Sequence, residues 1–194
     1  IDLSAYYWSP IGCGITNISK DWFNYLDFRV STTSFQGIFD GNGYKISGIN
    51  TSIDLESYKS NYNGFAFINV YYSGLFGKVN GGTIKNLIID GSEYFAESLG
   101  GFLSGTAVTM DEIYVGGLVG WAETSTIENV YVYRSLSATV SRGSESCLGG
   151  VAGYLKDCTI KDCFSYERVH ESNSSSSYTS EYHKIGGIVG EVNN

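Results

Sequence analysis

The sequence predicts an all-β chain that winds into a β-solenoid, in which short strands of successive coils stack on one another. The composition is the first observation, because 25 Gly, 16 Tyr and 10 Phe stand beside a single Pro among 194 residues. Aromatic side chains suit a pleated, half-buried surface, and Gly suits tight turns. The second observation is that no segment carries a long apolar face at helical spacing. The third is a short Gly-rich string that recurs along the chain.

A Gly-flanked apolar pair opens each copy of this string. The copies begin at Gly74, Gly117, Gly150 and Gly187, which lie 43, 33 and 37 residues apart. In the first three copies an isoleucine follows ten residues later, at Ile84, Ile127 and Ile160. A constant inner spacing with a variable outer spacing predicts a rigid unit joined by loops of different length. One unit cannot bury its own apolar face, so we expect the units to stack with equivalent strands in parallel.

These boundaries predict a single domain over residues 1–194. Its expected parts are a lead-in (1–36), four repeats (37–73, 74–116, 117–149 and 150–186) and a truncated copy (187–194). The repeat from Gly37 is degenerate, because its isoleucine, Ile46, follows after nine residues instead of ten. Long inserts, expected as loops, occupy 90–115 and 166–184.

The last copy stops before its Thr-Ile half. An open solenoid end exposes strand edges and apolar core. Two explanations stay open: the sequence is one stretch of a longer solenoid, or subunits stack head to tail into a fibre. In both cases the expected partners are other protein segments or subunits that stack on the solenoid ends.

A polar residue follows each Thr-Ile-x string, at Asn86, Asn129 and Asp162. Because these residues share one place in the repeat, we expect them to stack at one corner of successive coils. Stacked amide and carboxyl side chains hydrogen-bond to the turn backbone and to one another. The three residues are therefore predicted to form a structural ladder and not an active site.

The Gly-x-x-Gly strings also carry a family resemblance. GLFG (74–77), GLVG (117–120), GVAG (150–153) and GIVG (187–190) resemble the GLUG motif. That motif is a repeat of bacterial surface and secreted proteins, including the non-catalytic region of immunoglobulin-A1-cleaving metallopeptidases. WSPIG (8–12) and FQGIFDGNGYKISGI (35–49) are similar to the lead-in of such repeats. The resemblance implies a right-handed parallel β-helix and an extracellular or cell-surface location, although two copies here lack the Leu.

The strand that begins at Val130 alternates valines with aromatic residues. If its valines face the core, its tyrosines point outward, and the aromatic residues of the next repeat stack above them. The predicted stripe consists of Tyr131, Tyr133, Phe164 and Tyr166. Such a stripe can bind sugar rings or another protein, because aromatic faces combine apolar area with a polar tip. In the alternatives, an insert covers the stripe, the stripe simply lines a sheet face, or the strand presents its other side outward.

The acidic balance of the chain argues against two classes of partner. The formal charge is −8 and the pI is about 4.7. An acidic chain repels phosphate, and no basic stripe offsets this, so nucleic acid is not an expected partner. An anionic membrane surface is disfavoured for the same reason. No run of about 18 apolar residues occurs, so no membrane insertion is expected.

Neither histidine belongs to a catalytic motif. A metallopeptidase requires His-Glu-x-x-His, and the stretch that begins at His170-Glu171 lacks the second His. A histidine base would also need a nearby nucleophile, and His170 and His183 lie far from any nucleophile-elbow string. We expect both on solvated loops.

Carboxylates, which glycosidases and lyases cluster on one face, are scattered in this sequence. The closest pairs are Asp54 with Glu56 and Asp111 with Glu112, each in an expected insert loop. The string from Asp40 resembles part of a calcium loop, but no bidentate Glu follows at the required distance. The sequence therefore predicts no catalytic residues, no cofactor and no metal site.

Cysteines and N-glycosylation sequons are the residues that could be covalently modified. The four cysteines are Cys13, Cys147, Cys158 and Cys163. Mostly buried free thiols are favoured, and a bridge from Cys147 to Cys158 or Cys163 is the alternative. Sequons for N-glycosylation begin at Asn17, Asn50 and Asn173.

Together these features predict a non-enzymatic, extracellular β-solenoid module that acts as a structural stalk or adhesin segment. Its expected ligands are carbohydrate or a host or cell-surface protein. One alternative is a self-assembling filament subunit that stacks through its open ends. A carbohydrate-active β-helix enzyme is the other.

Overall fold

The computed structural model describes most of the chain, with gaps. The described residues are 1–5, 8, 10–12, 15–20, 33–49, 66–99, 102–103, 106–140, 145–166, 168–173 and 183–194. Within these ranges every regular element is a β-strand, which confirms the all-β prediction. The same ranges hold no helix of the length and apolarity needed to cross a membrane.

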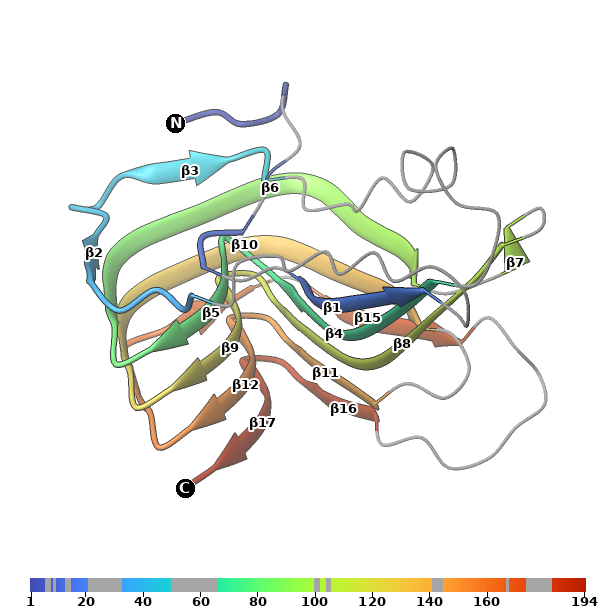
Figure 1. Cartoon of the computed structure of the whole chain (residues 1–194). Helices are drawn as coiled ribbons and strands as arrows, with labels where there is room; N and C mark the ends of the chain where they lie inside the picture. The colour runs from blue at the N-terminus through green and yellow to red at the C-terminus, as the bar shows by residue number, and fades with distance from the viewer. Residues whose placement is uncertain are drawn as a thin grey trace.

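The strands form three sheets, which the chain visits in turn as it winds (Figure 1). The long sheet consists of β2 (Ile38–Asp40), β3 (Lys45–Ser47), β6 (Thr83–Leu99), β10 (Thr126–Val140), β13 (Thr159–Lys161), β14 (Phe164–Ser165) and β15 (Val169–Asn173). The short sheet consists of β5 (Phe76–Asn80), β9 (Val119–Glu123), β12 (Ala152–Lys156) and β17 (Val189–Asn193). The third sheet consists of β1 (Ile15–Lys20), β4 (Ala66–Ser73), β7 (Phe102–Leu103), β8 (Thr106–Gly116), β11 (Glu145–Gly149) and β16 (His183–Gly186).

From β4 onward the chain passes through the third, the short and the long sheet in that order, and then repeats the circuit. Strands of successive circuits pair in parallel in all three sheets. The antiparallel pairs among the described strands are β1 with β4 and β7 with β8. This arrangement is the predicted parallel β-solenoid, and each circuit is one coil.

The register between coils follows the constant spacing seen in the sequence. Ile127 lies beside Ile84 of the preceding coil and beside Ile160 of the following one. Ile84 and Ile127 are fully buried, so this column of isoleucines is part of the core. Equivalent residues therefore stack on one another, and each coil covers the apolar face of its neighbour.

The core between the short and the long sheet is built from such columns. Leu75, Leu118 and Val151 form one column, Phe76, Val119 and Ala152 a second, and Val79, Ala122 and Leu155 a third. All nine are buried. Because burial of apolar surface contributes roughly 25 cal/mol per Å², these columns are the main stabilising contribution that the described coils share.

The register corrects the alignment of the repeat from Gly37. Phe39, and not Ile46, lies beside Ile84, whereas Ile46 lies beside Ile89. The cause is a turn at residues 41–44, where Asn42 and Gly43 have φ of 51° and 74°. These four residues span the distance that residues 86–87 cover in the next coil.

The expectation that 90–115 and 166–184 are loops was wrong for much of their length. Most of 90–115 belongs to β6 and β8, and Asp111 and Glu112 lie on β8 and not in a loop. The second segment contributes β15 and the first residues of β16. The extra residues lengthen the long sheet, because residues 95–99 of β6 find partners in residues 136–140 of β10.

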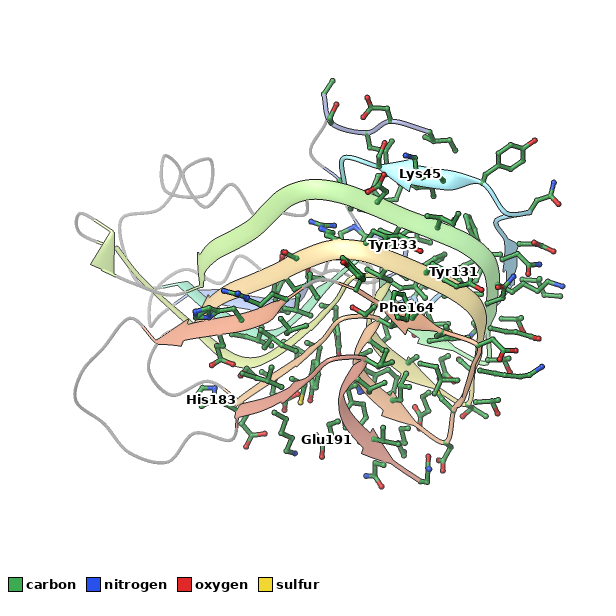
Figure 2. All side chains as sticks on the ribbon, turned by 180° about the vertical axis from the view of Figure 1, so that it is seen from behind. Lys45, Tyr131, Tyr133, Phe164, His183 and Glu191 are labelled. Carbon is green, nitrogen blue, oxygen red and sulfur yellow. The ribbon has the colours of Figure 1, made fainter. Side chains whose placement is uncertain are left out.

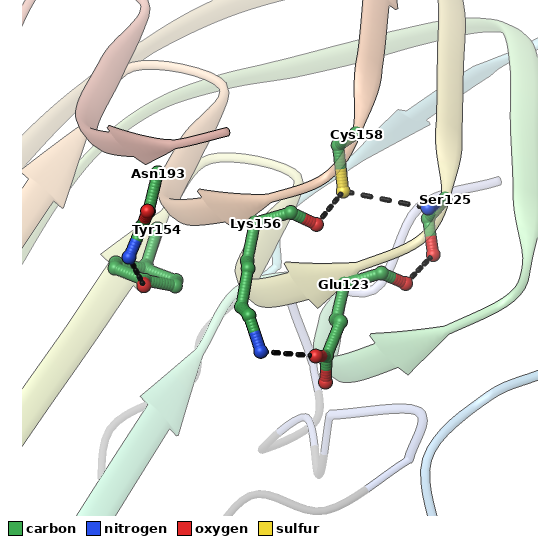
Figure 3. Close-up of polar contacts among 6 residues, drawn as sticks. All are labelled: Glu123, Ser125, Tyr154, Lys156, Cys158 and Asn193. Atoms are coloured by element: carbon green, nitrogen blue, oxygen red, sulfur yellow. Dashed lines mark hydrogen bonds and ion pairs between the residues drawn. The ribbon is translucent and has the colours of Figure 1, made fainter.

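Residues with left-handed backbone form the corner between the short and the long sheet. They are Gly81, Thr124 and Asp157, with φ of 73°, 50° and 50°. Side chains join successive coils near this corner (Figure 3). Lys156 Nζ lies 2.7 Å from Glu123 Oε1, and the Ser125 N–H donates to Cys158 Sγ at 3.4 Å. This corner was not predicted from the sequence, because Gly81, Thr124 and Asp157 share no residue type.

Described residues of the predicted lead-in continue the solenoid at its N-terminal end. Asp2 bridges to Ser47 in parallel, beside the long sheet. Ile11 bridges to Phe76 of the short sheet, and Trp8 Nε1 donates to the Leu75 carbonyl oxygen at 3.0 Å. The lead-in residues therefore pack on the coils that follow.

Glycines stand where neighbouring coils approach one another closely. A Cβ at Gly150 would clash with the Gly187 carbonyl oxygen of the next coil and with Ser165 Oγ. At Gly187, the same place one coil later, an added Cβ would have no described atom within 4 Å. The two glycines are chemically equivalent, but only Gly150 is confined by a covering coil.

We therefore expect Gly150→Ala to lower the free energy of unfolding by about 1–3 kcal/mol, because the coils must move apart to admit the methyl group. Gly187→Ala is the matched control and should change it by less than about 0.5 kcal/mol. Urea unfolding of both variants measures the difference. Equal stability of the two variants would contradict the close approach at Gly150.

Candidate functional site

A second left-handed corner positions the candidate site on the long sheet. Asn86, Asn129 and Asp162 occupy it in successive coils, with φ of 55°, 54° and 51°. Asn and Asp tolerate this conformation better than other residues with a Cβ. The corner therefore explains why the repeat carries these residue types directly after Thr-Ile-x.

Hydrogen bonds connect these corners along the solenoid axis. Asn129 Nδ2 donates to Asn86 Oδ1 at 2.8 Å, and Asn86 Nδ2 donates to Asp40 Oδ1 at 3.0 Å. The Asn86 side chain, followed by the Asn42 N–H, lowers the pKa of Asp40. Asp40, considered above as part of a calcium loop, thus extends the ladder. Asp162 shares the backbone conformation, and its carboxylate lies 3.5 Å from Lys161 Nζ.

Beyond this corner, β10 presents its aromatic residues to solvent. Val130 and Val132 are buried, so the intervening tyrosines face outward, and Tyr131 lies beside Phe164 of the next coil. The exposed fractions of Tyr131, Tyr133, Phe164 and Tyr166 are 37%, 40%, 43% and 70%. We call these four residues the aromatic face. The inward and outward assignment that the sequence left open is thereby decided.

Three rings of the aromatic face, those of Tyr133, Phe164 and Tyr166, are close enough to form one platform. The Tyr133 ring centroid lies 6.3 Å from that of Phe164 and 6.2 Å from that of Tyr166. Phe164 and Tyr166 are 6.2 Å apart. Tyr131, Tyr133 and Phe164 project from the outer side of the long sheet (Figure 2). β10 pairs with β6 on one side and with β14 on the other, so Tyr131 and Tyr133 stand on a strand that is held from both sides. β14, which carries Phe164, pairs with β10 alone among the described strands.

Paired charges border the aromatic face. Lys45 Nζ lies 2.8 Å from Asp90 Oδ2, and Asp90 is the register neighbour of Tyr133. Toward the corner, Lys161 Nζ lies 3.3 Å from Glu128 Oε1. Both of these lysines have an anionic partner, whereas Arg168, exposed two residues after Tyr166, has no ion-pair partner among the described residues.

One comparison with known proteins bears directly on this geometry. The family described as the GLUG motif matches residues 111–132. The chain carries a GLUG motif. The match supports the interpretation of the chain as a GLUG-motif repeat protein. No curated protein and no solved structure matched in the other two comparisons.

The matched GLUG segment covers part of one circuit of the solenoid and touches all three sheets. It runs from β8 through the glycine turn and β9 to Val132 of β10. It therefore includes the ladder residue Asn129 and the first ring of the aromatic face, Tyr131. The second glycine of three GLUG strings, at Gly120, Gly153 and Gly190, also lies at a close contact. A Cβ at Gly153, for example, would lie 2.6 Å from the Gly120 carbonyl oxygen.

A second aromatic cluster follows the GLUG strings directly, and the sequence analysis missed it. Trp121 and Tyr154, each the residue after a GLUG string, stack with ring centroids 5.9 Å apart. Lys78, the equivalent residue one coil earlier, places its Nζ 4.3 Å from the Trp121 centroid. Tyr114 of the third sheet meets Tyr154 edge-on at 5.7 Å. The repeated position after each string was the signal that could have revealed the cluster.

A polar cluster between the long and the third sheet joins buried Ser146 to Glu171 and to His183, which lies at the surface. Ser146 Oγ donates to Glu171 Oε2 at 2.8 Å. His183 Nδ1 lies 2.6 Å from Glu171 Oε1 and 2.8 Å from Ser146 Oγ. A catalytic relay would need the serine and the carboxylate on different ring nitrogens. Because both contacts use Nδ1, the cluster links the long and the third sheet and is not arranged as a triad.

The expectation that both histidines lie on loops was wrong. His170 lies on β15, and His183 lies on β16 (Figure 2). Both positions pair in register with a neighbouring coil, His170 with Ser137 and His183 with Ser146. The paired strands lie far apart in the sequence, so local sequence patterns do not predict this pairing.

The remaining candidate residues are distributed over the fold. Cys147, Cys158 and Cys163 are free, which confirms the favoured prediction for these three, although only Cys147 is fully buried. Asn17 lies on β1 and Asn173 ends β15. Cys13, Asn50, Asp54 and Glu56 lie outside the described residues. In the described part of the chain, no group of three or more His, Cys, Asp or Glu residues could hold a metal ion.

The ladder generates a test at its central residue. Asn129→Ala should lower the free energy of unfolding by about 1–3 kcal/mol, because it removes a hydrogen bond and leaves a Cβ in left-handed backbone. Asn129→Gly removes the same hydrogen bond without the backbone strain and should be the more stable of the two by about 1 kcal/mol. Urea unfolding compares them. An Ala variant as stable as the Gly variant would exclude the left-handed corner.

The buried thiol generates a second test. Burial, together with a hydrogen bond from Cys147 Sγ to Glu191 Oε2, raises the pKa of Cys147 to about 12. Alkylation of native Cys147 should therefore be slow at pH 8 and accelerate as the pH rises toward 12. Glu191→Gln removes the negative charge, lowers the pKa and should increase the rate at pH 9, roughly tenfold for each unit of pKa. Mass spectrometry of the Cys147 peptide measures the rate. An unchanged rate would show that Glu191 does not control this thiol.

Proposed function

We propose that the chain is a non-enzymatic, extracellular β-solenoid module that serves as a structural stalk or adhesin segment. The stalk component is supported by the parallel ladders and by the buried columns that connect every described coil to the next. Such an array transmits force along its axis through many equivalent hydrogen bonds. The extracellular location is supported by the GLUG resemblance alone.

The aromatic face is the observation that supports an adhesive role. Four large aromatic side chains on one flat surface reduce solubility, and a purely structural stalk has no use for them. Elsewhere along the same strands the outward positions hold Thr, Lys and Glu, as at Thr126, Lys85 and Glu128. Ile88, the register neighbour of Tyr131 in the preceding coil, is apolar but carries no ring. The cluster of contacting rings is confined to two adjacent coils and points to contact with a ligand.

The non-enzymatic part of the proposal rests on the chemistry of the described residues. Asp90, Glu123 and Glu128 each pair with a different lysine and do not converge on a shared position. The Ser146, Glu171 and His183 cluster has Ser146 fully buried, so a substrate could not reach its hydroxyl. A carbohydrate-active enzyme is therefore the weaker alternative.

Filament assembly is a second candidate, and one observation favours it. Ile185 of β16 and Val192 of β17 are 49% and 54% exposed, although they continue columns that are buried in earlier coils. A further strand from the same or another polypeptide would cover them. At the other side of the third sheet, however, β1 runs antiparallel to β4. A continuous parallel ladder between copies is therefore interrupted in that sheet.

The proposed function is tested by retention of the full chain on immobilised neutral polysaccharides, anionic polysaccharides and extracellular-matrix proteins. Surface plasmon resonance should detect binding to at least one surface. The double variant Tyr133→Ala/Tyr166→Ala should lose at least tenfold in affinity, because it removes two of the four rings. Tyr44→Ala is the matched control, since Tyr44 is 68% exposed but its ring is not among the contacting rings of the aromatic face. Binding that all three proteins share, or no binding at all, would refute the adhesive role.

A further inference from the structure

We propose that the aromatic face binds an uncharged oligosaccharide through the apolar faces of its sugar rings. The inference rests on the proposed function, because it names the ligand class of the same surface. Three observations support it: the size of the face, the charges around it and the hydroxyl groups that it carries.

The face has the dimensions of a few small rings. Its residues stand on two adjacent strands, about 4.8 Å apart, and on alternate positions about 7 Å apart along each strand. The ring centroids of Tyr133, Phe164 and Tyr166 lie 6.2–6.3 Å from one another. A pyranose ring is comparable in size to a phenyl ring, so a ligand of about two sugar units covers the platform.

The exposed area distinguishes this ligand from a second copy of the chain. From the exposed fractions of the four residues, the aromatic face offers about 400 Å². A stable protein interface buries about 800 Å² on each partner. The face is therefore about half of what a stable dimer needs, whereas a short oligosaccharide requires no more than this area.

The charges around the face favour an uncharged ligand. Lys45 is paired with Asp90 and Lys161 is paired with Glu128, so neither lysine offers an unpaired cation to a uronate or sulfate group. Arg168, exposed beside Tyr166 and without an ion-pair partner among the described residues, is a single cation at one end of the face. The chain as a whole carries a formal charge of −8, which repels anionic polymers. A neutral sugar avoids both penalties.

Hydroxyl groups supply the polar part of the recognition. Tyr131, Tyr133 and Tyr166 each carry a phenol that both donates and accepts a hydrogen bond. The Lys45 ammonium and the Asp90 carboxylate, with side chains 56% and 39% exposed, add donors and acceptors beside Tyr133. Apolar rings flanked by hydroxyl, ammonium and carboxylate groups match the alternation of C–H faces and hydroxyl edges on a sugar.

Isothermal titration calorimetry of the full chain tests the inference. The neutral probes are cellohexaose, xylohexaose, mannohexaose and maltohexaose, and the anionic probe is hexagalacturonate. We expect at least one neutral probe to bind, the anionic probe to bind at least tenfold more weakly, and Tyr166→Ala to weaken the neutral probe at least tenfold. Tyr44→Ala should bind like the unmodified chain. Circular dichroism and urea unfolding establish that both variants retain the fold.

Three outcomes would overturn the inference. The first is that no neutral probe binds, or that Tyr166→Ala binds it as well as the unmodified chain does. The second is tighter binding of hexagalacturonate than of any neutral probe. The third is self-association in sedimentation velocity that Tyr166→Ala abolishes, which would make a second copy the occupant. If retention on a protein surface still depends on the aromatic face, the adhesive function stands and only the carbohydrate assignment fails.

Discussion

Parallel pairing between successive coils is the constraint on which the rest of this structure depends. Each residue lies beside its counterpart one coil away, so a side chain that suits one coil must suit the next. The isoleucine column of Ile84, Ile127 and Ile160 meets this condition with one residue type. Gly150 meets this condition because it has no side chain, which would hold the coils apart. The segments outside the paired strands can differ in length, so the copies differ in total length while their inner spacing stays constant.

The same pairing determines where the aromatic face lies. In a strand, successive side chains alternate between the two faces, and a slip of one residue would exchange core and surface. The ladder corner at Asn129 lies directly before Val130, and the hydrogen bond to Asn86 fixes this corner relative to the preceding coil. With the valines of β10 held in the core, its tyrosines are directed outward. A structural ladder and a candidate binding surface are thus consequences of one register.

Polar groups inside the solenoid show how the long and the third sheet are held together where the apolar columns end. Burial lowers the pKa of Arg134 to about 10, so its guanidinium stays charged at neutral pH inside the fold. Glu171 bonds to Ser146 and His183, which belong to two different strands of the third sheet. Buried polar groups of this kind require partners, and satisfied partners specify a unique arrangement of the sheets.

The sequence by itself determined the fold class, the repeated unit, the polar corner after Thr-Ile-x and the residues of the aromatic stripe, because all of these follow from local spacing that recurs in each copy. Only the tertiary structure decided the face on which the valines of β10 lie, since both sides of that strand are apolar in sequence. It also decided that residues 95–99 form strand and not loop, because they gain partners from the next coil. The alignment of Phe39 with Ile84 and the meeting of Ser146 with Glu171 and His183 depend on contacts between distant residues. Local periodicity specifies what each coil is made of, whereas burial and hydrogen bonding between coils specify how the coils are aligned.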